Sequence, residues 1–178
     1  MTTVLPTAAG EFRLRPVEPA DLPLITEWMN DPAVAAFWEL AGPAEATERQ
    51  VLAQLAEGSH SRPLLGLLDG VPMSYWEVYQ AERDALAAHY PARPGDTGVH
   101  LLLGPPRYRG RGLAAVLLAA LAEELLRRGS RVVAEPDVRN TASVRAFQQA
   151  GFTAAGELEL PEKRALLMIR ERERHRGA

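Results

Sequence analysis

The C-terminal half of the chain reads as a strand, a helix, a strand and a helix in direct succession, and this order constrains the fold more than any other feature. The four segments are 98–104, 110–128, 131–135 and 141–150. Two strands that flank a long helix are joined by a crossover connection, which places them parallel in one sheet. The pattern therefore predicts an α/β fold that contains a parallel strand pair.

The N-terminal half adds a strand, two helices and an antiparallel hairpin. The expected segments are a strand at 12–15, helices that begin near Asp21 and Pro43, a hairpin over 64–79 that turns at Asp69-Gly70, a polar loop over 81–97 and a closing hairpin over 152–169. No linker is long enough to separate two domains. Residues 1–178 are therefore predicted to form one domain.

A turn rich in glycine and arginine, Arg107-Tyr108-Arg109-Gly110-Arg111-Gly112-Leu113, joins the first of the parallel strands to its helix. Glycines at the start of a helix let free backbone N–H groups face an anion, and the helix dipole favours negative charge there. The turn is not a P-loop and lacks the third glycine of a dinucleotide fingerprint. We interpret it as a diphosphate cradle, with a plain surface loop as the alternative.

Charge and composition narrow the choice of ligand. The net charge is −3 and the sequence pI is about 5.8, which argues against a nucleic-acid binder. The basic residues between Arg107 and Arg145 suit a small anion instead. The chain has no cysteine, and its histidines lack metal-ligand spacing. The first ten residues do not resemble a signal peptide, and no apolar run approaches a membrane span. We expect a cytoplasmic protein without a metal, nucleic-acid or membrane partner.

A second motif opens the last helix. Asn140-x-x-Ser143-x-Arg145-x-Phe147-x-x-x-Gly151-Phe152 places a favourable N-cap at the start of the helix and a glycine at its end. Each residue also has a purely structural explanation. Together with the turn at 107–112 and a strand between the two, the motif resembles the GNAT superfamily of N-acetyltransferases, and the resemblance covers nearly the whole chain.

The resemblance implies the GNAT fold, a mixed central sheet of about seven strands with splayed parallel fourth and fifth strands and flanking helices. Residues 1–178 would be a single GNAT acyltransferase domain that uses acyl-coenzyme A, as acetyl-CoA or succinyl-CoA, as its co-substrate. The residues expected to bind it are the strand amides of Leu101, Leu102 and Leu103 in an oxyanion-hole role, the turn residues Arg107, Arg109, Gly110, Arg111, Gly112 and Leu113, and the motif residues Asn140, Ser143 and Arg145.

Three strings resemble the siderophore branch of this superfamily. They are Asp31-Pro32-x-Val34-x-x-Phe37-Trp38-Glu39, then Tyr75-Trp76-Glu77-Val78-Tyr79 followed by Glu82-x-Asp84, and Asp96-x-Gly98-x-His100-Leu101-Leu102-Leu103-Gly104. Enzymes of that branch acylate N-hydroxylated lysine, ornithine or cadaverine, or lysine itself. The resemblance implies an acyl-CoA-dependent N-acyltransferase of hydroxamate siderophore biosynthesis and iron acquisition. It maps the catalytic His and Asp of the branch onto His100 and Asp137.

The chemistry of these two positions fits that assignment. Histidine, with an unperturbed pKa of about 6.5, suits a general base at neutral pH, and we expect His100 to take the proton that the nitrogen nucleophile sheds. Asp137 would orient the imidazole or transfer protons itself. Many acetyltransferases carry a tyrosine acid where this chain has Phe147, so the thiolate is expected to leave without a dedicated acid. A core histidine and a turn aspartate are the structural alternatives.

The acceptor is expected to be a small amine or hydroxylamine, bound by a monomer or homodimer. Trp38, Trp76 and Tyr79 would wall its aliphatic chain, and Glu77 or Asp84 would pair with its distal ammonium. Core packing of the aromatic residues and solvation of the acids are the alternatives. The residue types leave the acyl group open, as they do the choice among hydroxylysine, hydroxyornithine and hydroxycadaverine.

Two rival functions are considered. An aminoglycoside 6′-N-acetyltransferase would share the turn and the Trp-rich N-terminal region, but such enzymes tend to carry Asp at the position of His100 and Tyr at that of Phe147. A catalytically silent coenzyme A sensor is the rival from outside the enzyme class.

Overall fold

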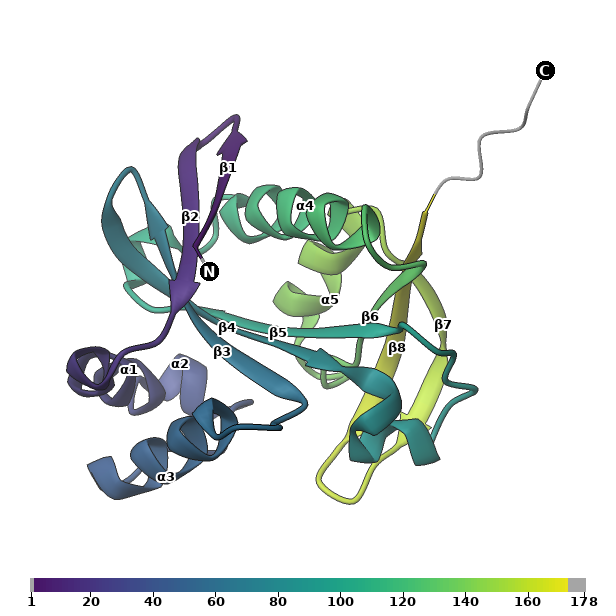
Figure 1. Cartoon of the computed structure of the whole chain (residues 1–178), viewed down its shortest axis with the longest axis horizontal. Coiled ribbons are helices and arrows are strands. Elements are labelled where there is room, and N and C mark those ends of the chain that lie inside the picture. The colour runs from purple at the N-terminus through teal and green to yellow at the C-terminus, as the bar shows by residue number, and fades with distance from the viewer. Residues whose placement is uncertain (1, 173–178) are drawn as a thin grey trace.

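The structure, a computed structural model, describes residues 2–172 and consists of one mixed sheet with helices on both faces (Figure 1). The sheet has eight strands in the order β1-β2-β3-β4-β5-β6-β8-β7. The strands are β1 (Thr3–Thr7), β2 (Gly10–Pro16), β3 (Ser61–Leu68), β4 (Val71–Gln80), β5 (Thr97–Leu103), β6 (Arg131–Ala134), β7 (Thr153–Glu159) and β8 (Arg164–Glu171). The helices are α1 (Leu22–Met29), α2 (Pro32–Ala35), α3 (Ala44–Leu55), α4 (Leu113–Leu126) and α5 (Thr141–Gln149), with short 3-10 turns at Pro19–Asp21, Ala81–Arg83, Ala85–Ala88 and Pro106–Tyr108.

Alternation along the strands creates two apolar layers. Trp76 of β4 and Val99 of β5 pack with residues of α4 and α5 in one core cluster. Tyr75 of β4 and Leu102 of β5 face the other way and pack with residues of α1, α2 and α3. Because residues two apart on a strand share a face, Glu77 lies on the face of Tyr75. That face carries the candidate site.

β5 and β6 form the parallel pair that the sequence predicts. Their register contains only two pairs, Thr97↔Val132 and Gly98↔Val133, after which the strands separate, whereas β5 stays paired with β4 along its whole length. Glycine is required where the parallel pairing ends, because a Cβ on Gly98 would lie 2.1 Å from the ring of Tyr79. The strands therefore open toward their carboxyl ends, where α/β sheets commonly bind ligands.

The structure differs from the sequence-based expectation in two elements. The sheet contains an eighth strand, because Thr3–Thr7 pairs with β2 in a hairpin that the sequence analysis did not predict. The helix expected at 110–128 spans only Leu113–Leu126, because Gly112 adopts a φ of 72°. This left-handed conformation is open to glycine and cannot continue a right-handed helix.

A buried ion pair holds the closed end of the parallel pair. Arg131, at the start of β6, donates from Nε to Asp96 Oδ1 at 2.8 Å, and the two side chains are 5% and 0% exposed. The Tyr90 hydroxyl and the Arg93 amide donate to the same carboxylate. Burial works against the charge of Asp96, but the Arg131 guanidinium and these donors lower its pKa. The network fastens the segment before β5 onto β6.

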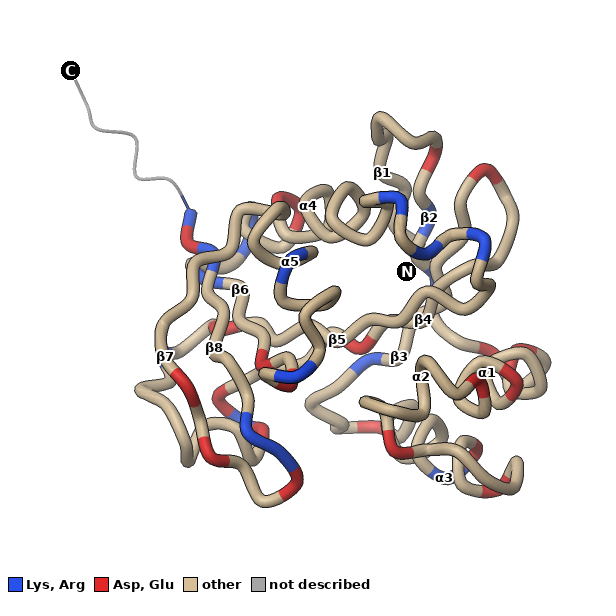
Figure 2. The backbone as a smooth tube through the Cα atoms, turned by 180° about the vertical axis from the view of Figure 1, so that it is seen from behind, with Lys and Arg blue, Asp and Glu red and all other residues tan. Residues whose placement is uncertain are grey.

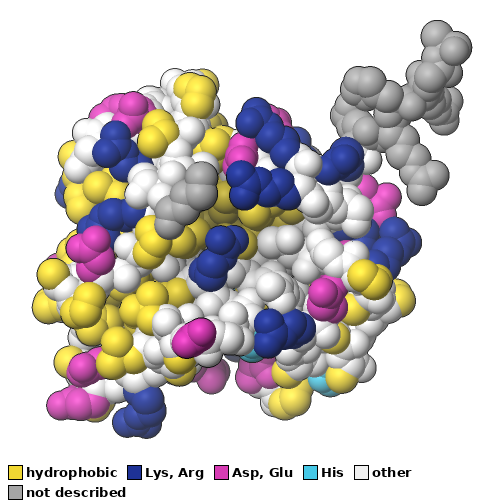
Figure 3. Space-filling view, viewed as in Figure 1, with side chains coloured by type: hydrophobic (Ala, Val, Ile, Leu, Met, Phe, Trp, Pro, Cys, Tyr) yellow, Lys and Arg dark blue, Asp and Glu magenta, His cyan; other side chains and the backbone are white. Residues whose placement is uncertain are grey.

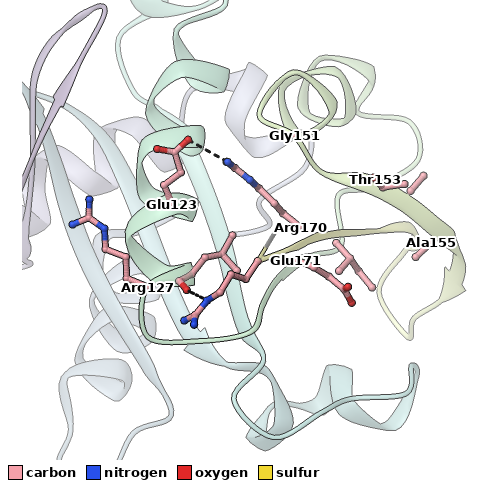
Figure 4. A pocket seen from close by; sticks show the side chains of 11 residues that line it. Glu123, Arg127, Gly151, Thr153, Ala155, Arg170 and Glu171 are labelled. Carbon is pink, nitrogen blue, oxygen red and sulfur yellow. Dashed lines mark hydrogen bonds and ion pairs between the residues drawn. The ribbon is translucent and has the colours of Figure 1, made fainter. Parts of the chain in front are cut away.

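A groove of about 900 Å³ lies between the C-terminal end of α4 and strands β7 and β8 (Figure 4). Two of its three arginines, Arg170 and Arg172, are engaged within the fold. Arg170 donates to the carbonyl oxygen of Ala150 and to Glu123, and Arg172 donates to that of Leu126. These bonds satisfy the carbonyl groups that helix ends leave without partners. The two arginines therefore cap the ends of α5 and α4.

Two features are absent from residues 2–172: a helix that could span a membrane and a group of side chains that could hold a metal ion. No helix there is long and apolar enough to cross a membrane, and no three His, Asp or Glu side chains are grouped to hold a metal ion. Leu52 and Leu55 of α3 are exposed, and Figure 3 shows hydrophobic side chains on the side of the molecule where α1 and α3 lie. Scattered exposed apolar residues of this kind are normal.

Candidate active site

His100 of β5 lies between two buried carboxylates. Its Nδ1 is 3.2 Å from Glu77 Oε2, and its Nε2 contacts Glu135 Oε1. Glu77 is opposite His100 in the antiparallel register. Gly98 and Val133 are partners in the parallel register, and His100 and Glu135 each lie two residues beyond them. Both side chains therefore lie on the same face of the sheet, at the point where the strands separate. The side chain of His100 is 35% exposed, against 8% for Glu77 and 7% for Glu135. The histidine is the most exposed member of this cluster.

Both ring nitrogens of His100 donate in this arrangement, because an ionised carboxylate only accepts hydrogen bonds. Burial disfavours the imidazolium, but Glu135 and Glu77 outweigh it and raise the pKa of His100 to about 10. Burial raises the pKa values of Glu135 and Glu77, but the imidazolium of His100 outweighs it. The pKa of Glu135 is lowered to about 2, and that of Glu77 is also lowered. Two carboxylates and one imidazolium carry a net charge of −1. The neutral His100 expected from the sequence is therefore not the state that this arrangement favours.

Further hydrogen bonds fix the two carboxylates in place. Gln54 of α3 donates to Glu77 Oε1 at 2.6 Å, and the Tyr75 hydroxyl donates to the same oxygen at 3.0 Å. The Tyr79 hydroxyl donates to Glu135 Oε2 at 2.8 Å. A chain of polar side chains thus crosses the sheet from α3 to the end of β6. Both oxygens of Glu77 already have partners, one in this chain and one in His100, so the structure does not favour Glu77 as the partner of a distal ammonium.

Asp137 pairs with Arg139 and makes no hydrogen bond with His100. Its carboxylate accepts from the Arg139 backbone amide at 2.8 Å and from the Arg139 side chain at 2.7 Å. These bonds, against the effect of burial, lower the pKa of Asp137 to about 2. The residue also forms an isolated β-bridge with Ala165. The expected pairing of Asp137 with His100 is wrong in this structure, which places Glu135, two residues earlier, beside the imidazole.

The predicted aromatic walls divide between the two faces of the sheet. Trp38 packs edge-on against His100 with ring centroids 6.0 Å apart, and the Tyr79 ring lies 4.9 Å from the same imidazole. Trp76 is fully buried in the opposite layer, where its indole N–H donates to Ser74. Trp38 and Tyr79 therefore border the site, whereas Trp76 does not, because alternation on β4 turns it away.

Asp84 has a local structural function. Its carboxylate accepts from the backbone amide of Leu86 at 3.0 Å and caps a 3-10 turn. It also pairs with His60 Nε2 at 2.9 Å. These contacts engage the carboxylate, and after burial and Glu135 its charge also raises the pKa of Tyr79. The pairing of Asp84 with a substrate ammonium stays a prediction.

The backbone of β5 presents amides where β6 separates. The Gly104 amide donates to Met73 O of β4 at 2.9 Å, and amides alternate in direction along an antiparallel pair. The amide of Leu102 therefore also faces β4, whereas those of Leu101 and Leu103 face the side that β6 leaves. Two of the three amides expected at a thioester carbonyl are suitably directed, and that of Leu102 is not.

The turn before α4 exposes its glycines. Gly110 and Gly112 have φ values of 71° and 72°, and a Cβ on either would meet no atom within 4 Å. No side chain caps α4, so its first-turn amides point toward the turn. Arg107 and Arg111 are exposed, and Figure 2 shows basic segments gathered around this turn. These features suit an anion.

Arg109 differs from the other two arginines of the turn. Its Nε donates to Leu103 O at 3.0 Å, and its Nη2 donates to Asp31 Oδ2 at 3.1 Å. Asp31 in turn caps α2. Arg109 therefore braces the turn against the end of β5 and α2, and its charge is already engaged. Leu113, the last turn residue of the prediction, begins α4 and packs against the core.

The second motif shapes the start of α5. Asn140 Oδ1 accepts from the Ser143 amide at 3.1 Å, and Phe147 is buried with its ring centroid 5.1 Å from that of Phe152. Arg145 is exposed. Asn140 and Ser143 thus form the N-cap expected from the structural explanation of the motif, while Arg145 presents its charge to solvent.

Glu135, like Gln54, is a residue of the cluster that the sequence alone did not reveal. It ends the apolar run Val132-Val133-Ala134 and precedes Pro136. A buried carboxylate is costly unless it is paired, so an acid that ends a fully buried strand signals a partner. Glu135 follows the same strand as Asp137, so its position at the strand end also marks it as a candidate site residue.

Fold and site together define a class of protein. An open mixed sheet whose parallel strands separate beside a glycine-rich helix start, with a polar cluster at the point of separation, is the architecture of an acyl-transferring enzyme. The chain belongs to the GNAT acetyltransferase family, because the family described as "Acetyltransferase (GNAT) domain" matches residues 18–160. The family and the fold inferred from the two motifs are confirmed.

Comparison with known proteins adds the branch. The chain is 38% identical over 167 residues to the lysine N-acyltransferase MbtK of Mycobacterium sp. (strain MCS). The aligned region covers 92% of this chain and 68% of that protein. It is 35% identical to the N(6)-hydroxylysine O-acetyltransferase of Escherichia coli, over 86% of this chain and 49% of that one. The solved aminoglycoside acetyltransferase AAC(6′)-Ib in complex with coenzyme A superposes with a TM-score of 0.77 and 26% identity, over 90% and 95% of the two chains. The resemblance to the siderophore branch is confirmed.

Proposed function

We propose that the protein is an acyl-CoA-dependent N-acyltransferase that acts on an N-hydroxylated diamine or amino acid in hydroxamate siderophore biosynthesis. The observation that carries this proposal is the cluster of Glu77, His100 and Glu135 at the point where β5 and β6 separate. The names of two curated relatives, one for lysine and one for N6-hydroxylysine, support an acceptor of the hydroxylysine type. Hydroxyornithine and hydroxycadaverine are proposed as acceptors of the same class. Residues 1–178 serve this reaction as one domain.

Acyl-coenzyme A, as acetyl-CoA or succinyl-CoA, is the proposed co-substrate. A structural neighbour solved with coenzyme A supports it, as does the exposed glycine turn. The residues that hold the diphosphate are the amides of Gly110 and Gly112 and the side chains of Arg107 and Arg111. The amides of Leu101 and Leu103 polarise the thioester carbonyl. Transfer is direct, from the thioester to the acceptor nitrogen.

The carboxylate–imidazolium cluster moves the proton that acylation displaces. Attack of the neutral acceptor nitrogen on the thioester carbon forms the N–C bond and leaves that nitrogen protonated. As the carbon–sulfur bond breaks, His100 donates a ring proton to the departing thiolate, and the neutral imidazole that results takes the proton from the acylated nitrogen. This second transfer restores the imidazolium, while Glu77 and Glu135 stay ionised and hold it in place. The imidazolium thus supplies the acid that the chain lacks at Phe147, and it acts before the neutral base that the sequence predicts.

A second candidate acceptor is an aminoglycoside amine, because AAC(6′)-Ib shares the fold. His100 and Phe147 occupy the two positions where aminoglycoside acetyltransferases tend to carry Asp and Tyr, and this favours the hydroxylamine. A coenzyme A sensor without turnover is the third candidate. The intact cluster around His100 argues against it, since a sensor does not need a proton-transfer group.

Thiol release distinguishes these three functions. The protein is incubated with acetyl-CoA or succinyl-CoA and, separately, with N-hydroxylysine, N-hydroxycadaverine or kanamycin, and free thiol is followed. We expect release with at least one hydroxylamine and little with kanamycin. Release with kanamycin alone would overturn the proposed acceptor. Tight coenzyme A binding without release by any amine would favour the sensor.

The substitution Gly112→Val should weaken coenzyme A binding about tenfold or more. A side chain at a φ of 72° strains the backbone by about 1–3 kcal/mol, and it would occupy the space in front of the α4 amides. Calorimetric titration measures the change in Kd. Gly156→Val is the matched control, because Gly156 also has a positive φ and open space around it but lies in β7. Equal affinity in both variants would remove the turn from the binding site.

A further inference from the structure

Lys163, the single lysine of the sequence, lies at the tip of the β7–β8 hairpin. Two backbone hydrogen bonds with Leu160 close the turn. The isolated bridge between Asp137 and Ala165 holds the hairpin against the segment that follows β6. The tip is therefore beside the segment that carries Glu135, although it is distant from it in sequence.

Alternation along β8 directs Lys163 to the face of the sheet that carries His100. Leu167 packs with Tyr79 on that face, whereas Leu166 packs in the layer of α4 and α5. Residues two apart on a strand share a face. Counting back from Leu167 through Ala165 therefore places Lys163 on the same face as Leu167. The lysine thus extends the candidate site beyond the cluster at the end of β6.

The ammonium of Lys163 acts on the site through its charge. The side chain is half-buried, and no ion pair or hydrogen bond engages the ammonium within residues 2–172. Against burial, His100 and then Lys163 lower the pKa of Glu135. Arg139 and, more weakly, Lys163 lower the pKa of Asp137. Arg139 is already committed to Asp137, so among the residues that the structure describes Lys163 is a cation near Glu135 that can meet an incoming anion.

We propose that Lys163 binds a carboxylate carried by one of the two substrates. This inference rests on the proposed function, in which the acceptor nitrogen reacts at the cluster of His100 and Glu135. An aliphatic chain that leaves this cluster along the same face leads to Lys163. The carboxylate belongs either to an amino-acid acceptor, such as hydroxylysine, or to a dicarboxylic acyl group, such as succinyl. An ammonium pairs with either as a charged hydrogen-bond donor.

A two-by-two kinetic experiment tests the proposal and identifies the source of the carboxylate. The value of kcat/KM is measured for acetyl-CoA and succinyl-CoA, each with N-hydroxylysine and N-hydroxycadaverine, in the wild type and in Lys163→Gln. Loss of a charged hydrogen bond lowers kcat/KM about 10- to 100-fold. We expect this loss only in the pairs that contain the recognised carboxylate. Acetyl-CoA with N-hydroxycadaverine has none, so its rate should stay or rise.

Two variants on the same hairpin serve as controls. Lys163→Arg keeps the charge and should retain most of the rate. Arg164→Gln removes the adjacent charge, which pairs with Glu157 at the exposed edge, and should change none of the four rates. An equal loss in all four pairs of Lys163→Gln, or no loss in any, would overturn the role of Lys163. Absence of turnover by the wild type in all four pairs would instead overturn the proposed function.

Chemical labelling gives a second measurement that does not depend on turnover. Because the sequence has one lysine, an amine-reactive reagent labels Lys163 and the N-terminus, and mass spectrometry separates the two. The carboxylate-bearing substrate should protect Lys163 while leaving the N-terminus reactive. Unchanged labelling at a saturating concentration of every substrate would contradict the proposal.

Discussion

Replacing His100 by alanine should lower kcat about 10²- to 10⁴-fold, which is the usual contribution of a positioned proton-transfer group. The substitution removes the cation between Glu77 and Glu135 and the proton that the thiolate receives. The turn before α4 is built from other residues, so the Kd for coenzyme A should change little. Steady-state kinetics and calorimetric titration measure the two quantities on the same preparation.

His60→Ala is the matched control for this variant. His60 also contacts a carboxylate, that of Asp84, at 2.9 Å, but it lies outside the cluster. We expect the His60→Ala variant to have the same kcat as the wild type. If His100→Ala also kept the wild-type kcat with intact coenzyme A binding, His100 would be a packing residue and the proposed mechanism would fail.

The pH profile of kcat separates two roles for the imidazole. An imidazolium that donates a proton is present at neutral pH and is lost as the pH rises through about 10. The value of kcat should therefore be constant near neutrality and fall as the pH approaches 10. A neutral base would give the opposite slope, with a rate that climbs toward pH 10.

The free energy of unfolding should also depend on the protonation of His100. Because the pKa of His100 is raised in the folded state, its contribution to stability is complete below about pH 6.5 and is lost as the pH rises through about 10.

Replacing Asp96 by alanine should lower the free energy of unfolding by about 3–5 kcal/mol, because it leaves Arg131 buried without its partner. The loss should appear in urea as a lower midpoint with an unchanged m-value. The pKa of Asp96 is lowered in the fold, so the stability it contributes is present above its ordinary pKa and is lost as the pH falls. The wild type should therefore lose stability on acidification more steeply than Asp96→Ala.

Glu171→Ala provides the comparison for that experiment. It breaks the ion pair between Arg93 and Glu171, whose side chains are 61% and 56% exposed, and solvent-exposed pairs contribute about 0–1 kcal/mol. A shift of similar size in both variants would show that burial of the Asp96–Arg131 pair does not determine its contribution.

The sequence alone was sufficient for the family and for most of the architecture. Local patterns carry that information: alternation on the strands, the apolar stripe of α4 and the glycine turn before it each depend on residues close together in the chain. The exposed glycines at 110 and 112 and the imidazole at 100 were therefore found without coordinates. The strand Thr3–Thr7 was missed, because its residues form a strand only through pairing with β2.

The residues around His100 were decided by tertiary structure. Glu77, Gln54 and Glu135 come from three elements, and no spacing in the sequence shows that they meet across β4, β5 and the end of β6. The separation of β5 from β6 after Gly98 brings Glu135 to the imidazole, while the turn after β6 takes Asp137 to Arg139. The charge state of His100 follows from those contacts. Composition and local pattern thus determine which elements form, whereas the pairing of distant strands determines which acid meets which base.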